Sequence, residues 1–367
     1  MTARVTMRQI AERADVSIGT VSHVINGTAV VRARLRERVL EAIRSLGYQP
    51  SALARGLRRN RTNILGMVIP DITNPFFPSV VRGVEDMAYK RSFRVILCNA
   101  DNDPSKEASY VQELRSYHIA GLLIIPSVGV DIASHLEAYT SAAIPVVCID
   151  RVPEGWDGDA VLVANADGAY QATRHLIQMG HERLAVITGP LKLTNASDRL
   201  KGFTRALNEA SLSVEPEFVQ EAQFDTPSGY QAALRLLKML PRPTAIFAGN
   251  DLIAFGVLQA ARELGLRCPA DVSIAGFDSL EFTKFTDPSL TSVYQPGYQL
   301  GATAARVLLQ RIDGMKSAPK KILLETELNR RNSVGPPPPA GMPKSDERKL
   351  QVRAHIDRKR SPPVEKS

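Results

Sequence analysis

The chain has 367 residues, about twice the usual length of one domain, so we expect two or three folded units. Its 44% apolar and 23% charged residues exclude a protein that is disordered throughout. The net charge of +8 is uneven, because residues 1–61 carry 12 arginines, no lysine and 4 acids, whereas residues 62–334 carry a net charge of −4. A basic head on a mildly acidic body predicts that only the head meets a polyanion.

The cysteines and the N-terminus limit the compartment and the chemistry. Cys98, Cys148 and Cys268 are far apart, which excludes a disulfide framework and a Cys-x-x-Cys metal pair and suits a reducing compartment. The charged N-terminus contains no apolar signal sequence, and the apolar run at 119–126 is too short to span a bilayer. We therefore expect a cytoplasmic, nucleoid-associated protein with no metal, no cofactor and no membrane contact.

Residues 1–49 are predicted to form a DNA-binding domain of short helices. The apolar residues of 7–14 recur at helical spacing, Ser17 is a good N-cap for the next helix, and Arg32–Leu46 forms a third helix that stops at Gly47. Two short helices around a four-residue turn, backed by a third helix, are typical of a helix-turn-helix.

The outer face of the second helix favours DNA binding over a generic helical bundle. It carries few long side chains, and its residues are Ile18, Gly19, Ser22, His23 and Asn26. A small residue such as Gly19 lets a helix lie deep in a major groove, where His23 could donate to a guanine acceptor. A generic bundle would explain neither this face nor the 12 arginines.

Residues 50–62 are predicted to be a hinge. The segment 51–58 has eight residues and includes Gly56, so it is too short for a stable isolated helix, which needs about 12–15 residues. We expect it to be disordered alone and helical only when a partner chain and DNA cover it. The alternative is a flexible, arginine-rich linker.

The body, residues 63–334, alternates strand and helix patterns, which predicts parallel sheets in two doubly wound lobes on either side of about residue 165. The predicted strands are Ile64–Ile69, Arg94–Asn99, Leu122–Ile125, Val146–Ile149, Leu184–Thr188, Ala245–Ala248 and Val272–Phe277. Ligands bind at the carboxyl ends of such strands, where this sequence places polar and small residues.

Residues 335–367 are predicted to be a disordered, proline-rich basic tail. Four consecutive prolines begin at residue 336, and no leucine heptad follows them. A solvated tail is favoured over a weak contact with phosphates.

The ordered motifs resemble those of LacI/GalR-type transcriptional repressors over about residues 5–334. They are the helix-turn-helix run 7–26, the hinge run 47–58, Asn74-Pro75-Phe76-Phe77, Asp101-Asn102-Asp103-Pro104, Arg199-Leu200-Lys201-Gly202-Phe203, Asn250-Asp251 and Gly276-Phe277-Asp278. The resemblance implies a homodimer that binds a pseudo-palindromic double-stranded operator. It also implies a body similar to periplasmic sugar-binding proteins, with an N-lobe of about 63–164 plus 295–325 and a C-lobe of about 165–294.

The resemblance also assigns DNA contacts. Base reading falls on Ile18, Gly19 and His23, and phosphate contacts fall on Thr20 and Ser22. In the hinge, Leu57 is the wedge that enters the minor groove. The full set of expected DNA-binding residues is Thr6, Ser17, Ile18, Gly19, Thr20, Ser22, His23, Asn26, Ala54, Arg55, Leu57 and Arg58.

The effector contacts that the resemblance implies combine carboxylates, an arginine and aromatic rings, which suit a sugar. Leu193 stands where some purine-binding relatives have arginine, which makes a purine less favoured. The expected effector-binding residues are Phe76, Phe77, Asn99, Asp101, Ser127, Asp150, Arg151, Arg199, Phe224, Asn250 and Asp278.

Three other classes compete with a sugar-controlled repressor. An enzyme is disfavoured because no nucleotide-binding, nucleophile-elbow or zinc motif occurs, so we expect no catalytic residue. A sugar-binding transport protein would have a signal peptide and no basic head. A repressor of the same family controlled by a protein partner stays open, as does the sign of the ligand's effect on DNA binding.

Overall fold

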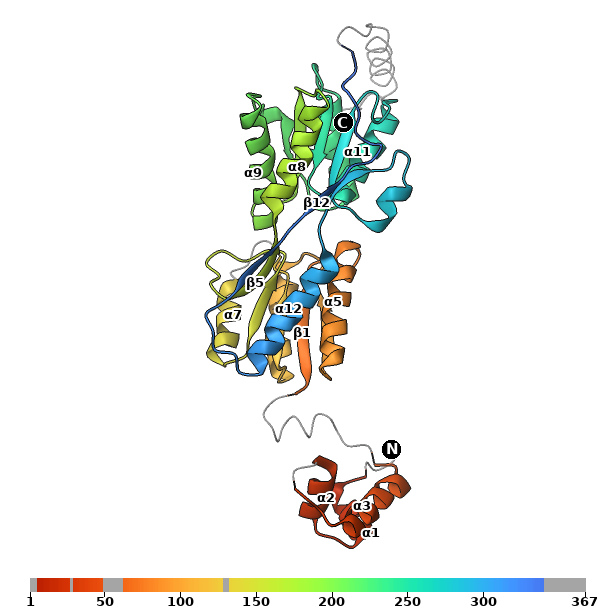
Figure 1. Cartoon of the computed structure of the whole chain (residues 1–367), viewed down its shortest axis with the longest axis vertical. Helices are drawn as coiled ribbons and strands as arrows, with labels where there is room; N and C mark the ends of the chain where they lie inside the picture. Colours follow the sequence, from red (N-terminus) through yellow and green to blue (C-terminus); the bar gives the residue numbers. More distant parts are fainter. Residues whose placement is uncertain (1–4, 27–28, 49–61, 128–131, 340–367) are drawn as a thin grey trace, which may run out of the picture. The chain divides into compact units, whose positions relative to one another are not determined.

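The computed structural model describes residues 5–26, 29–48, 62–127 and 132–339 (Figure 1). The chain divides into two compact units, Met1–Asn63 and Ile64–Ser367. Within the described residues, no helix is long and apolar enough to cross a membrane.

The head contains α1 (Met7–Ala14), α2 (Ile18–Asn26) and α3 (Ala33–Leu46), which confirms the predicted helix-turn-helix. Small and branched apolar side chains from all three helices form its core, with Ile10, Val21 and Val39 fully buried. The turn between α1 and α2 is braced by Arg38, whose guanidinium donates to the Asp15 carboxylate at 2.9 Å. The third helix ends at Gly47, which adopts a left-handed φ of 62°.

The N-lobe is a six-stranded, all-parallel sheet with helices on both faces. Its strand order is β11-β5-β4-β3-β1-β2. The strands are β1 (Ile64–Ile69), β2 (Arg94–Asn99), β3 (Gly121–Ile124), β4 (Val146–Ile149), β5 (Asp159–Val163) and β11 (Lys321–Leu324). The helices are α5 (Phe76–Lys90), α6 (Pro104–Ser116), α7 (Ile132–Ser141) and α12 (Gly297–Ile312).

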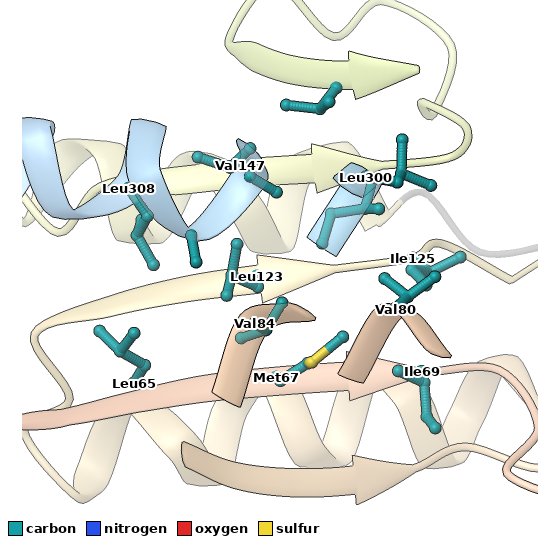
Figure 2. Packing of buried hydrophobic residues seen from close by; sticks show 14 of the residues in the cluster. Leu65, Met67, Ile69, Val80, Val84, Leu123, Ile125, Val147, Leu300 and Leu308 are labelled. Carbon is teal, nitrogen blue, oxygen red and sulfur yellow. The ribbon is translucent and has the colours of Figure 1, made fainter. Parts of the chain in front are cut away.

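Alternate side chains of the central strands divide the N-lobe core into two layers. Leu65 and Met67 of β1 pack with Val84 of α5 and Leu308 of α12 on one face (Figure 2). Val68, the intervening residue of β1, packs on the other face with residues of α6 and α7. Strands buried on both faces explain why their sequences read as continuous apolar runs.

The C-lobe repeats this plan with the strand order β12-β10-β9-β8-β6-β7. Its strands are β6 (Leu184–Thr188), β7 (Val219–Glu221), β8 (Ala245–Ala248), β9 (Ser273–Asp278), β10 (Thr291–Tyr294) and β12 (Glu327–Asn329). Its helices are α8 (Asn165–Gln178), α9 (Thr194–Glu209), α10 (Thr226–Leu237) and α11 (Asp251–Glu263). Helices α8 and α9 pack on one face of the sheet, and α10 and α11 pack on the other. The two doubly wound lobes are confirmed.

The chain crosses between the lobes three times, before α8, after β10 and between β11 and β12 (Figure 1). The third crossing corrects the expected C-lobe of 165–294, because β12 pairs antiparallel with β10 and adds residues beyond 325. The folded body also extends past the expected end at 334, since the buried Gly335 carbonyl accepts hydrogen bonds from His181 Nε2 and Ser273 Oγ. The rest of the predicted tail, 340–367, lies outside the described residues.

Candidate functional site

The carboxyl ends of strands from both lobes converge on one small cavity. Asp150 and Arg151 directly follow β4, Asn250 lies two residues after the end of β8, and Asp278 ends β9. The cavity is lined by Asn74, Phe76, Phe77, Asp150, Arg151, Asn195, Arg199, Phe224, Asn250, Asp278 and Gln295. Its volume is about 20 Å³, which is room for about one water molecule.

Arg199 of α9 is the central cation of this cavity. Its buried guanidinium donates from Nε to Asn165 Oδ1 at 2.8 Å and from Nη1 to the Gly249 carbonyl at 2.6 Å. The same Nη1 lies 3.9 Å from Asp278 Oδ1, and the guanidinium carbon lies 3.7 Å from the centre of the Phe277 ring. These contacts hold the guanidinium in one position from several sides.

Two buried carboxylates face the arginine from opposite lobes. Asp150 accepts a hydrogen bond on Oδ2 from Asn195 Nδ2 at 2.8 Å, and Asp278 accepts one on Oδ1 from Gln295 Nε2 at 2.5 Å. Asp150 Oδ1 and Gln295 Oε1 are buried and have no hydrogen-bond partner among the described residues. Buried acceptors without partners are costly, so these two oxygens are positions where ligand donors would gain most.

Burial and neighbouring charges act in opposite directions on these groups. Burial raises the pKa of Asp150 and that of Asp278, while the nearby Arg199 lowers both. Burial lowers the pKa of Arg199, and the attraction of Asp278 and Asp150 opposes that shift. The cluster is therefore an electrostatically balanced set in which each charge depends on the others.

Eight of the eleven residues expected to bind an effector line this cavity. They are Phe76, Phe77, Asp150, Arg151, Arg199, Phe224, Asn250 and Asp278. Asn250 also caps α11, because its Oδ1 accepts from the Ile253 amide at 2.9 Å, and Arg151 Nε donates to the Pro126 carbonyl at 2.5 Å.

The other three expected residues, Asn99, Asp101 and Ser127, lie outside the cavity lining. Asn99 donates to Asp101, whose carboxylate pairs with Lys106 on the surface. Asn99 ends the edge strand β2 and Asp101 follows it; neither belongs to the cavity lining, although β2 pairs with β1, the strand that precedes Asn74 and Phe76. Ser127 donates its amide to the Glu107 carboxylate at 2.7 Å, and its hydroxyl is buried.

Three amide side chains in the cavity were missed by the sequence reasoning: Asn74, Asn195 and Gln295. Asn195 lies in the first turn of α9, and Gln295 lies where the chain crosses from β10 to α12. Asn74 precedes α5 in the Asn-Pro-Phe-Phe motif, so its position next to that motif was the available signal.

Several of the residues expected to contact DNA are exposed on the head. Thr6 caps α1 in a reciprocal pair with Gln9, and Ser17 Oγ accepts from the Thr20 amide at 3.1 Å. Ile18 is 47% exposed although it is apolar, and Gly19 is exposed beside it. His23 is exposed and Ser22 is half-buried. The Asn26 side chain and the hinge residues Ala54, Arg55, Leu57 and Arg58 lie outside the described residues.

A β-carbon added at Gly19 would meet only Ser17 Oγ, at 3.6 Å. That distance is ordinary van der Waals contact, so the fold of the head does not require glycine at this position. Glycine lowers helix stability relative to alanine. The presence of Gly19 on the exposed face of α2 therefore fits a surface to which another molecule binds closely.

Two family models match the chain. Bacterial regulatory proteins of the lacI family match residues 6–51, and the periplasmic binding protein-like domain matches residues 173–334. The HTH-type transcriptional repressor PurR of Proteus mirabilis (strain HI4320) is 38% identical over 335 residues, which is 91% of this chain and 98% of that protein. PurR of Haemophilus influenzae (strain PittEE) is 38% identical over 307 residues, 84% of this chain and 91% of that protein.

Solved structures agree with these matches. The lac repressor dimer bound to operator and the anti-inducer ONPF superimposes with a TM-score of 0.81 at 27% identity, covering 91% of this chain and all of that one. A transcriptional regulator CelR–cellobiose complex gives 0.69 at 32% identity, covering 90% and 100%. A LacI family regulator from Enterococcus faecium with bound ribose gives 0.66 at 32%, covering 74% and 99%.

Proposed function

The chain belongs to the LacI family of bacterial regulatory proteins and is a DNA-binding transcriptional repressor rather than an enzyme, and from that premise we propose that a sugar bound between the lobes controls its affinity for a pseudo-palindromic operator. We further propose that it acts as a homodimer on chromosomal DNA in the cytoplasm. Structural relatives described with cellobiose and with ribose support the ligand class.

The observation that carries the ligand proposal is the pair of unpartnered acceptors, Asp150 Oδ1 and Gln295 Oε1. Each is buried in the cavity lining and calls for a hydrogen-bond donor. Sugar hydroxyls supply such donors in several directions, and the Phe77 and Phe224 side chains in the same lining offer apolar contact for a ring. A ligand with acceptors alone would leave both oxygens unsatisfied.

The charges of the lining favour an uncharged ligand. Arg151 and Arg199 face Asp150 and Asp278, so the ionised set is balanced. Adding a phosphate or a carboxylate would bury charge without a free counterion, which costs several kcal/mol. We therefore propose a neutral sugar rather than a sugar phosphate.

The small size of the cavity couples ligand binding to DNA binding. A space of about 20 Å³ cannot hold a sugar, so entry requires the lobes to move apart. In a dimer, such movement changes the separation of the two hinge segments 51–58, and only one separation lets both fold on DNA. Ligand and operator are then coupled through a folding equilibrium, typically by ~1–3 kcal/mol or ~5–150-fold in affinity.

The proposed DNA contacts come from the head, mainly from the exposed face of α2, and from the hinge. We propose that Ile18, Gly19 and His23 face base edges, with Ile18 against a thymine methyl and His23 donating to a guanine. Thr6, Ser17, Thr20, Ser22 and Asn26 serve phosphate and positioning contacts. In the hinge, Leu57 enters the minor groove, Ala54 faces the dimer mate, and Arg55 and Arg58 approach the backbone.

Calorimetry with a panel of sugars that includes ribose and cellobiose, together with operator binding by fluorescence anisotropy, tests this function. The operator is selected from random duplexes with the full-length protein. At least one neutral sugar should bind and change operator affinity, while its phosphate ester should not bind. A repressor whose operator affinity responds to no sugar but changes when a cell protein binds it would favour the protein-controlled alternative.

A further inference from the structure

The loop that carries Asp278 into the cavity has an unfavourable backbone. Asp278 has a φ of 103° and Ser279 a φ of 48°, and neither is glycine. Residues held in such regions cost about 1–3 kcal/mol each and persist only when their surroundings fix them. Something outside the loop must therefore hold it.

Asp251, the first residue of α11, holds the loop from beneath. Its Oδ2 accepts a hydrogen bond from the Leu280 amide at 2.8 Å. Its Oδ1 accepts from Ser292 Oγ at 2.6 Å, and Ser292 Oγ in turn accepts from the Ser279 amide at 3.0 Å. Both amides that follow Asp278 thus depend on one carboxylate, directly or through a single hydroxyl.

The neighbouring residues leave space for the buried Asp251 carboxylate. Asp251 is 0% exposed, and a β-carbon at Gly276 would lie 2.3 Å from its Oδ1. Gly276 on β9 is therefore the residue that makes room for the carboxylate. On the opposite side of the loop, Asn329 Nδ2 and Arg331 Nη2 donate to Ser279 Oγ at 2.9 and 3.1 Å.

We propose that Asp251, which does not line the cavity, is a positioning residue that fixes the backbone of residues 278–280 and so aims the Asp278 carboxylate at the effector. This role rests on the proposed function of the cavity. Asp251 holds the loop in its ionised form, because both of its carboxylate oxygens accept hydrogen bonds. A proton on Oδ1 would turn toward Ser292 Oγ and leave the hydroxyl hydrogen of Ser292 without its acceptor.

Burial, opposed by neighbouring hydrogen bonds and charges, places the ionisation of Asp251 near neutral pH. Burial raises the pKa of Asp251 to about 7, while Ser292, the Leu280 amide, Arg331 and Arg199 act to lower it. Burial raises the pKa of Asp278, and repulsion from Asp251 raises it further. The hydrogen bonds from Ser292 and the Leu280 amide lower the pKa of Asp251, so they are strongest to the ionised form. The local hold on the loop should therefore tighten as pH rises through about 7, whereas the cost of burying the charge lowers the global stability of the protein over the same range.

Hydrogen exchange of the full-length protein tests the proposal without any ligand. Mass spectrometry of peptides that span residues 278–281, corrected for intrinsic exchange, should show protection that increases between pH 5.5 and 8. In Asp251→Asn, protection should be about 10–100-fold lower at pH 8, the effect of losing a hydrogen bond to a charged group, and it should not vary with pH. The control Asp198→Asn removes an exposed carboxylate of α9 and should behave as wild type.

Ser292→Ala keeps the test valid if Asp251→Asn does not fold. It removes the hydroxyl that receives the Ser279 amide, so the same peptides should lose protection while the carboxylate stays in place. Wild-type protection and pH profile in a folded Asp251→Asn, or in Ser292→Ala, would overturn the positioning role.

Ribose and cellobiose calorimetry separates this inference from the proposed function. If either sugar binds wild type, Asp251→Asn should bind it about 10–100-fold more weakly at pH 8, and equal affinity would refute the positioning of Asp278. If no sugar binds wild type but the exchange results are as expected, the ligand class fails while the hold of Asp251 on the loop stands.

Discussion

Replacing Gly19 by alanine separates the stability of the head from its contact with DNA. The added methyl group would meet only Ser17 Oγ at 3.6 Å, so it fits the free protein without strain. Alanine is about 0.5–1 kcal/mol better than glycine inside a helix, so α2 should become more stable. If α2 lies deep in a major groove, the same methyl group must displace DNA or the helix.

The substitution should raise the stability of α2 and lower operator affinity, so the two effects can be told apart. Amide protection in α2 should rise about 2–5-fold, the equivalent of that propensity gain. Specific operator affinity should fall about 10-fold or more, because forcing an extra group into a packed contact costs about 1–3 kcal/mol. The assays are hydrogen exchange of the full-length protein and anisotropy titrations of a labelled operator at fixed salt.

A graded series provides the control. Serine at position 19 should weaken operator binding further than alanine, while binding to random DNA should change little because it depends on phosphate contacts. Unchanged operator affinity in Gly19→Ala would refute the deep approach of α2, and lower protection of α2 would refute the reading of Gly19 as dispensable for folding.

Three further predictions concern the hinge, the cavity and pH. Leu57→Ala should weaken specific operator binding about 10–100-fold by anisotropy, because the wedge permits the DNA bend whose extra contacts offset an unstacking cost of a few kcal/mol, and it should leave sugar binding unchanged. Asp278→Ala should weaken sugar binding about 10–100-fold by calorimetry, with sugar-free operator affinity intact; retained sugar affinity would remove Asp278 from the site. Because the pKa of Asp251 is raised from 3.8 to about 7, its contribution to stability is full below pH 4 and is lost as pH rises through 7. Urea unfolding at pH 5 and pH 8 should therefore show wild type losing about 2–3 kcal/mol more than Asp251→Asn, and equal losses would contradict that pKa.

Most of the buried strands were predictable because their sequences are apolar and bounded by polar residues, although the buried strands β5 and β10 were not among those predicted. Strands β1, β2, β4, β6 and β8 begin and end at the predicted residues. The short strand β12 was not predicted, because its sequence Glu-Leu-Asn has no β-branched residue and is set by its antiparallel pairing with β10. Tertiary pairing of that kind leaves no local signal.

The cavity was largely predictable because ligand sites lie at the carboxyl ends of parallel strands. This rule identifies the edge of the sheet at which a ligand site lies, but it does not identify which strands end at that site. Asn99 and Asp101 satisfied the rule, yet β2 is the edge strand and its end lies outside the cavity. Gln295 also satisfies the rule, since it directly follows β10, which is parallel to β9, but β10 was not among the predicted strands.

Amide exchange of residues 51–58 tests most directly whether ligand binding is coupled to operator binding through folding of the hinge. The full-length protein is measured alone, with operator, and with operator plus a sugar that binds. A hinge that folds on DNA should be protected only with operator, and its protection should change when sugar is added. Equal protection of these residues with and without operator would contradict a hinge that folds on DNA.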